Sequence, residues 1–123
     1  VSPCAVGGII TADNIEKFNC RYIWGSANNQ IKASDIDEEI RIAKLIQEAG
    51  IVFQTEWWHN TAGVMCAALE YMEGDKATYD QLVEIIDRTL PDSTLNNFAE
   101  AEAKGITPTE NAYLTCSRTL YEE

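Results

Sequence analysis

The chain has 123 residues, 46% of them hydrophobic and 24% charged, which suits one small globular domain. Its formal net charge of -11 argues against nucleic acid and anionic membranes as partners, because both require clusters of Lys and Arg. No apolar run approaches the roughly 18 residues of a membrane span, and no basic flank marks a signal peptide. We therefore expect a cytoplasmic protein with neither nucleic acid nor membrane as a partner.

The sequence opens on Val1-Ser2-Pro3, an apolar start with no Met and no polar tail. We interpret this segment as the end of a buried strand whose beginning is missing, so the chain is expected to be part of a longer one. A processed N-terminus is the alternative.

The first part of the chain predicts short elements joined by tight turns. Thr11 is expected to cap a short helix that runs to Lys17, because its hydroxyl can accept an orphan backbone N–H. Residues 21–24 form a β-prone run that ends at Gly25, which is typical of a short buried parallel strand. A polar loop follows over residues 26–30.

A strong helix is predicted next, with Ser34 as its N-cap and acidic residues in its first turn. Its apolar face is expected to carry Ile36, Ile40, Ala43 and Ile46. Gly50 supplies the stop, and residues 51–53 form another short strand. The order strand, helix, strand predicts a βαβ unit with parallel strands.

From Asn60 onward the pattern is helical. The first stripe comprises Val64, Met65, Ala68, Leu69 and Met72. Gly74 ends this helix, and Pro91 is expected to end or kink the next one, after which Ser93 restarts it. Thr107 and Pro108 mark a clear helix start. We therefore divide the chain into an α/β part over residues 1–56 and C-terminal helices over residues 57–123.

Four cysteines occur, and none forms a Cys-x-x-Cys pair. They are Cys4, Cys20, Cys66 and Cys116. Free, mostly buried thiols are the expectation for a reducing compartment, with a disulfide or zinc as the alternatives. The acid-rich run over residues 35–39 is interpreted as a solvated helix start, so no metal site is predicted.

Three segments resemble the glutamate/leucine/phenylalanine/valine dehydrogenase family. Residues 2–10 resemble its Pro-Cys-Ala-x-Gly segment, and residues 23–30 resemble its Gly-(Ser/Ala)-Ala-Asn-Asn-Gln loop. Residues 50–52 and 60–65 resemble its Gly-Ile-(Leu/Val)-Tyr segment and its Asn-Ala-Gly-Gly-Val-Ile motif. Their order and spacing agree along the chain, as does the tail at residues 105–108.

The resemblance implies the second half of a Rossmann-type nucleotide-binding domain, with short parallel strands followed by a helical C-terminal region. It also implies oxidative deamination of an L-amino acid to a 2-oxo acid with NAD or NADP. No stretch resembles the family's substrate domain, which holds its catalytic lysine and aspartate. The Gly-x-Gly-x-x-Gly phosphate loop is missing too. The expected partner is thus the rest of a parent chain, and the fragment alone is expected to hold no cofactor tightly and to be inactive.

Two strand ends are the first candidates for cofactor binding. Pro3, Cys4 and Ala5 are expected at the carboxyl end of a parallel strand, where ligands bind in such sheets. Asn28 and Asn29 follow the next strand, and each amide offers two donors and an acceptor. From the residues alone both segments could be ordinary turns. The resemblance implies contacts with the nicotinamide ribose and carboxamide, and Asn29 is also a substrate-pocket candidate.

The third candidate is the segment that begins at Asn60. This residue could cap the following helix, and the resemblance implies that it also binds the nicotinamide carboxamide. By resemblance, Gly63 and Val64 belong to the substrate pocket, although Val64 could simply pack in a core. The chain departs from the family here, because Thr61 and Ala62 replace Ala and Gly. In addition, the segment Glu-Trp-Trp-His at residues 56–59 replaces a milder Asp-Tyr-Val-Ile type of sequence.

His59 is the single histidine of the sequence. No nucleophile or metal ligand is spaced for it, so we expect packing or surface exposure rather than catalysis. A second hypothesis for the whole chain is a non-catalytic helical module for packing or oligomerisation. A homo-oligomer is expected. Because the isolated fragment has exposed sheet edges, we expect it to dimerise, to swap elements or to cover those edges with its own helices.

Overall fold

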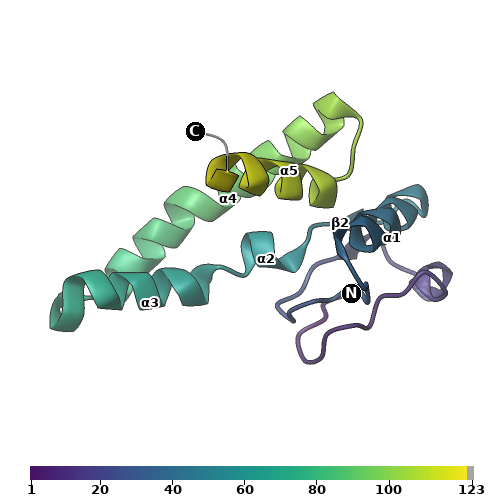
Figure 1. Cartoon of the computed structure of the whole chain (residues 1–123). Coiled ribbons are helices and arrows are strands. Elements are labelled where there is room, and N and C mark those ends of the chain that lie inside the picture. Colours follow the sequence, from purple (N-terminus) through teal and green to yellow (C-terminus); the bar gives the residue numbers. More distant parts are fainter. Residues whose placement is uncertain (122–123) are drawn as a thin grey trace.

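The structure is a computed structural model, and it describes residues 1–121. Its elements, in chain order, are the 3-10 helix η1 (Ile15–Lys17), β1 (Tyr22–Ile23), α1 (Ile36–Glu48), β2 (Val52–Phe53), α2 (Glu56–His59), α3 (Ala62–Glu73), the 3-10 helix η2 (Gly74–Lys76), α4 (Tyr79–Lys104) and α5 (Pro108–Tyr121). Figure 1 shows the short strands and α1 at one end of the molecule and the α3–α4 pair extending from it.

The two strands are parallel and are joined through α1, so the predicted βαβ unit is confirmed. Tyr22 pairs with Val52, and Ile23 pairs with Phe53. The first residues of the chain lie along the other edge of β1. There the Trp24 N–H donates to the carbonyl of Val1 at 3.0 Å. The segment expected to be a strand end is therefore held against β1.

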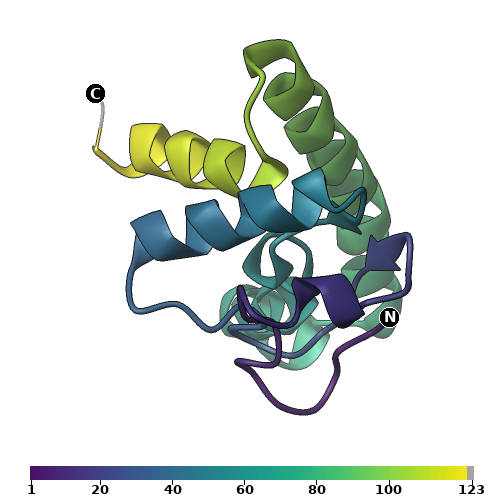
Figure 2. The same cartoon turned by 90° about the vertical axis from the view of Figure 1, so that its right-hand side faces the viewer.

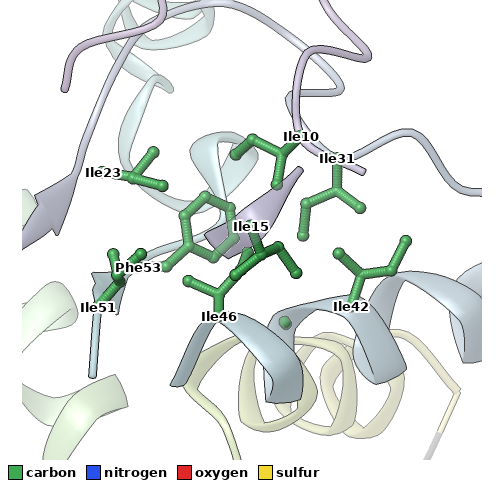
Figure 3. Packing of buried hydrophobic residues seen from close by; sticks show 9 residues of the cluster. Ile10, Ile15, Ile23, Ile31, Ile42, Ile46, Ile51 and Phe53 are labelled. Atoms are coloured by element: carbon green, nitrogen blue, oxygen red, sulfur yellow. The ribbon is translucent and has the colours of Figure 1, made fainter. Parts of the chain in front are cut away.

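A core of isoleucines fills the space between these strands and α1 (Figure 3). Its buried members are Ile10, Ile15, Ile23, Ile31, Ile42, Ala43, Ile46, Ile51 and Phe53. They come from short segments far apart in sequence. Burying one such side chain contributes about 1.5–3 kcal/mol to the stability of the fold. The cluster therefore stabilises the short segments that supply its residues.

The two predicted helix caps in this part were wrong by a few residues. Thr11 does not cap η1; its backbone N–H instead donates to Asn14 Oδ1 at 2.9 Å. The N-cap of α1 is Asp35, whose Oδ1 accepts the Glu38 N–H at 2.9 Å. Ser34 lies one residue earlier, and its hydroxyl donates to the Glu38 carboxylate. Ser and Asp both cap well, so the sequence does not separate adjacent candidates.

The buried face of α1 is rotated relative to the prediction. Ala43 and Ile46 are buried as expected, but Ile42 joins them, whereas Ile36 is 52% exposed. Ile36 is the first residue of the helix, beyond the reach of the strands. The predicted stop at Gly50 is confirmed by its left-handed φ of 75°.

Helices α3 and α4 lie side by side and form an arm, here called the α3–α4 arm (residues 62–104) (Figure 1). The predicted stop of α3 at Gly74 is confirmed. No residue of α3 is buried, and Val64 and Met72 of the expected apolar stripe are 72% and 78% exposed. This chain covers the stripe only in part, because Met65 and Leu69 are half-buried.

Pro91 does not end a helix, because α4 runs through it. The other predicted possibility, a kink at Pro91, stays a prediction. A proline in a helix removes one N–H donor, here the partner of the Asp87 carbonyl. Both residues are exposed, so water can reach that carbonyl. The helix can therefore continue on both sides of Pro91 although the Asp87 carbonyl lacks its N–H donor.

The start of α5 agrees with the prediction. Thr107 Oγ1 accepts the Glu110 N–H at 3.1 Å, and Pro108 is the first residue of the helix. Gly105 closes α4 with a left-handed φ of 68°. Figure 2 shows α5 lying beside α1, and the Tyr113 hydroxyl donates to Glu39 of α1 at 2.7 Å. The helical region therefore folds back onto the α/β part.

The four cysteines are free thiols, but the expectation that most are buried was wrong. Cys4 is exposed, and the other three are half-buried. Among residues 1–121, no helix is both long enough and apolar enough to cross a membrane.

Candidate functional site

The loop that leaves β1 lies directly against the first residues of the chain. Gly25 is buried between them, and a Cβ at this position would overlap the backbone oxygen of Pro3. The Ala27 N–H donates to the same Pro3 oxygen at 3.0 Å. Because Gly25 has no side chain, the segment at Pro3 can lie against the loop of residues 26–30, here called the asparagine loop.

A second glycine makes a similar close approach two residues after Ala5. A Cβ on Gly7 would overlap the backbone oxygen of Asn28. The next residue, Gly8, has a left-handed φ of 69° and donates its N–H to the Asn29 oxygen at 2.6 Å. The chain that follows Cys4 and Ala5 thus turns back across the asparagine loop.

Asn60 joins the same place from the other side. Its Nδ2 donates to Asn28 Oδ1 at 2.7 Å, although 32 residues separate the two in sequence. Its expected role as a helix cap was wrong, since the N-cap of α3 is Thr61 and Asn60 ends α2. The structure therefore brings together the three predicted cofactor segments, at residues 3–5, 28–29 and 60.

Most of these groups are accessible to a ligand. Cys4, Ala5, Asn28 and Asn29 are exposed, Asn60 is half-buried, and Pro3 is buried. Pro3 therefore contributes backbone rather than side-chain surface. Asn29 has a positive φ of 51°, a strained backbone conformation that Asn tolerates better than most residues.

Gly63 and Val64 follow Asn60 on the first turn of α3, and both are exposed. A Cβ on Gly63 would meet no atom within 4 Å. The alternative that Val64 packs in a core was wrong, because its side chain is 72% exposed. The substrate-pocket role of Gly63 and Val64 stays a prediction.

The thiol of Cys4 has an altered acidity that the sequence did not predict. Hydrogen bonds with the Ser2 hydroxyl, at 3.3 Å, and with Ser26 lower the pKa of Cys4 to about 7. A fraction of the thiol is therefore ionised at neutral pH.

Two further residues of α2 contact the asparagine loop, and neither was predicted to do so. Glu56 is 3% exposed, and its Oε1 accepts the Asn29 N–H at 2.6 Å. His59 donates from Nε2 to the Gly25 oxygen at 3.0 Å and stacks on Trp24 at 4.6 Å. Glu56, His59 and Asn60 lie three and four residues apart, so the helical spacing was the available signal.

The tryptophans between these residues contact other helices. Trp57 packs on Tyr113 of α5 with a ring-centroid distance of 5.0 Å. The Trp58 Nε1–H donates to the Ser93 oxygen of α4 at 3.4 Å. Trp57 and Trp58, which differ from the family pattern, thus connect α2 to α5 and α4.

The cavities of the described chain lie elsewhere. Two cavities of about 570 Å³ each lie away from the three cofactor segments. One is bounded by α1, β2 and the α4–α5 turn, and the other by residues near Thr11 and Arg41. Within residues 1–121, no group of three or more His, Cys, Asp or Glu side chains is arranged to hold a metal.

Known proteins that are similar to this chain over nearly its whole length are amino acid dehydrogenases. The chain is 29% identical to a leucine dehydrogenase of Thermoactinomyces intermedius, over 97% of this chain and 34% of that protein. It is 31% identical to a phenylalanine dehydrogenase of Lysinibacillus sphaericus, over 96% of this chain and 28% of that protein. It therefore spans about a third of the length of these relatives. No family model matches the chain.

A solved structure shows the same fold. The crystal structure of an L-tryptophan dehydrogenase from Nostoc punctiforme matches 91% of this chain and 31% of its own chain. The TM-score is 0.74 and the sequence identity is 24%. This likeness confirms the predicted fold class, part of a Rossmann-type dehydrogenase fold with a helical region after the short strands.

Proposed function

We propose that this chain, which is similar over nearly its whole length to leucine and phenylalanine dehydrogenases, forms the nicotinamide side of a cofactor-binding domain in a larger amino acid dehydrogenase. That enzyme would oxidatively deaminate an L-amino acid to a 2-oxo acid with NAD or NADP. The observation that supports the proposal is the meeting of residues 3–5, 28–29 and 60 at one place, through the Asn60–Asn28 bond and the Gly25–Pro3 approach.

The chemistry of the side chains at this place suits a nicotinamide. Its carboxamide presents one donor group and one acceptor, and the amides of Asn28, Asn29 and Asn60 present both. The glycines at 7 and 25 let backbone pass closely, so the surface is formed partly by peptide groups. These residues would hold the ring, which when bound takes up or gives a hydride.

The part played by this chain would be orientation rather than acid–base chemistry. Asn60 is fixed by Asn28, and the Asn28–Asn29 loop is fixed by β1 and α2, so the amides are held in place before a ligand arrives. Gly63 and Val64 would border the amino acid side chain at the start of α3. No segment of this sequence resembles the family's lysine-bearing domain, so we expect no turnover by these 123 residues alone.

An NADH fluorescence titration of the complete protein tests this proposal. The Asn60→Ala variant removes one amide and the contact with Asn28, so we expect the dissociation constant to rise about tenfold, the loss of roughly one hydrogen bond. Asn19 is exposed and lies outside the three cofactor segments, so Asn19→Ala is the matched control and should bind as the parent does. A complete protein that shows no NADH binding would refute the proposal.

A packing role is the second candidate function, and the exposed apolar side chains of the α3–α4 arm favour it. Val64, Tyr71 and Met72 of α3 and Tyr79 and Leu95 of α4 are each at least 67% exposed. Large apolar surface of this kind is typical of contact regions. Sedimentation of the 123-residue chain tests this role: association that Met72→Glu abolishes would support it, whereas a monomer at all concentrations would not.

A further inference from the structure

The function proposed above treats α2 as a support of the Asn28–Asn29 loop but assigns no role of its own to the buried carboxylate of Glu56. Glu56 is the first residue of α2 and is 3% exposed. A buried carboxylate is costly unless it is hydrogen-bonded. Its partner here is the Asn29 N–H, at 2.6 Å.

This bond acts on the residue of the loop that most needs support. Asn29 has a φ of 51°, in the left-handed region that is unfavourable for a non-glycine residue. Its N–H is held by Glu56, and its carbonyl oxygen accepts the Gly8 N–H at 2.6 Å. The backbone of residue 29 is thus held through both its N–H and its carbonyl.

The remaining contacts of α2 make Glu56 part of a rigid support. At the other end of the helix, Asn60 holds Asn28 and His59 holds the Gly25 carbonyl. Trp57 and Trp58 anchor the same helix to α5 and α4. The asparagine loop is therefore held by α2, and any shift of α2 would break its contacts with α4 and α5.

We infer that Glu56 is a positioning residue, which holds Asn28 and Asn29 in the orientation that binds the nicotinamide end of the cofactor. The inference rests on the proposed function. Glu56 itself touches neither cofactor nor substrate in this account, since its carboxylate is buried beneath the loop. Its contribution is to fix the backbone from which the two amides project.

Two substitutions separate this role from that of a simple buried charge. Glu56→Ala removes the acceptor, whereas Glu56→Gln keeps an oxygen at the same distance from the Asn29 N–H. In the complete protein we expect Glu56→Ala to weaken NADH binding about tenfold and Glu56→Gln to remain within about twofold of the parent. Glu48, an exposed residue of α1, provides the control Glu48→Ala, which should change nothing.

Hydrogen exchange measured by mass spectrometry supplies a readout that does not depend on activity. The peptide covering residues 26–30 should exchange faster in Glu56→Ala, whereas α1 should keep its protection. Glu56→Gln should restore slow exchange in that peptide. Should Glu56→Ala fail to fold, Glu56→Gln measured against the parent still tests the inference, because faster exchange at residues 26–30 in Glu56→Gln would overturn it.

The outcomes are distinguishable from failure of the proposed function. If the parent protein binds no NADH, the proposed function fails, and exchange at residues 26–30 alone reports on Glu56. If the parent binds NADH but Glu56→Ala binds it equally well, the positioning role is overturned. It is also overturned if Glu56→Gln loses affinity only for NAD⁺, since that result would assign an electrostatic role instead.

Discussion

The α/β part and the α3–α4 arm both contain apolar side chains, but the α/β part buries many of them and the arm leaves most of its own exposed or half-buried. In the α/β part, nine buried side chains from segments far apart in sequence close around α1 and the strands. In the arm, α3 buries no residue, and α4 buries only Asn97 and Ala101, both near its end. An apolar stripe therefore predicts which face of a helix would be covered, but not that this chain covers it.

The comparison also shows where the candidate site lies. Its loops rest on the dense core and are clamped by α2, the element that joins the two regions. A ligand site needs groups held by rigid neighbours, and here the core of the α/β part and α2 supply them. The arm contributes its first turn, with Gly63 and Val64, next to Asn60.

The largest expected effect contrasts the two regions directly. Ile46 is fully buried in the core of the α/β part, so Ile46→Ala should lower the free energy of unfolding by about 2–5 kcal/mol. Met72 is 78% exposed on the arm, and Met72→Ala should change it by less than about 0.5 kcal/mol. Urea denaturation followed by circular dichroism measures both. Equal losses would mean that the arm is packed as densely as the core.

An intermediate effect is expected where the two regions meet. Asn97 of α4 is 2% exposed and donates to Gln54 Oε1 at 3.2 Å and to the Pro108 oxygen at 2.9 Å. Asn97→Ala leaves buried acceptors without a donor, so it should destabilise the chain by about 1–3 kcal/mol. The neighbouring Asn96 is exposed, and Asn96→Ala is the matched control. Similar values for both variants would show that this junction contributes no stability.

The smallest expected effect concerns a carboxylate at the same junction. Burial raises the pKa of Glu39, and the nearby charge of Glu56 adds to the increase, whereas the hydrogen bond from Tyr113 opposes it. With a raised pKa, the folded chain binds the proton more tightly than the unfolded chain does. The resulting stabilisation is complete below the unfolded pKa and is lost as the pH rises through the folded pKa.

Glu39→Gln keeps an acceptor for Tyr113 without the charge. At neutral pH we expect it to raise the free energy of unfolding by less than about 1 kcal/mol, because water screens this half-buried group. Near pH 3, where the parent carboxyl is protonated, the gain should vanish. Thermal unfolding at both pH values measures it. A gain that persists in acid would rule out the charge as its cause.

Much of the fold was predictable because its signals are local. The βαβ unit follows from two β-prone runs around one amphipathic helix, and Gly50, Gly105 and Thr107 mark boundaries through their own backbone preferences. The failures had competing local signals or non-local causes. Ser34 and Asp35 are both good caps, and the helix through Pro91 depends on neighbours that a local rule does not see.

The candidate site shows the same division. The strand-end segments were expected to meet because carboxyl ends of parallel strands share one edge of a sheet. The contact of Asn60 with Asn28 crosses 32 residues, and the resemblance, not the spacing, suggested it. Glu56 was missed because an acidic residue at a helix start is ordinary in sequence, and only tertiary structure shows it buried under Asn29.

The central claim is that residues 3–5, 28–29 and 60 form one nicotinamide site. A crystal structure of the complete protein with NAD⁺ bound tests it most directly. We predict that the nicotinamide lies against these three segments, with its carboxamide within hydrogen-bond distance of an amide of Asn28, Asn29 or Asn60. A ring bound elsewhere, with this surface facing solvent or another subunit, would contradict the claim.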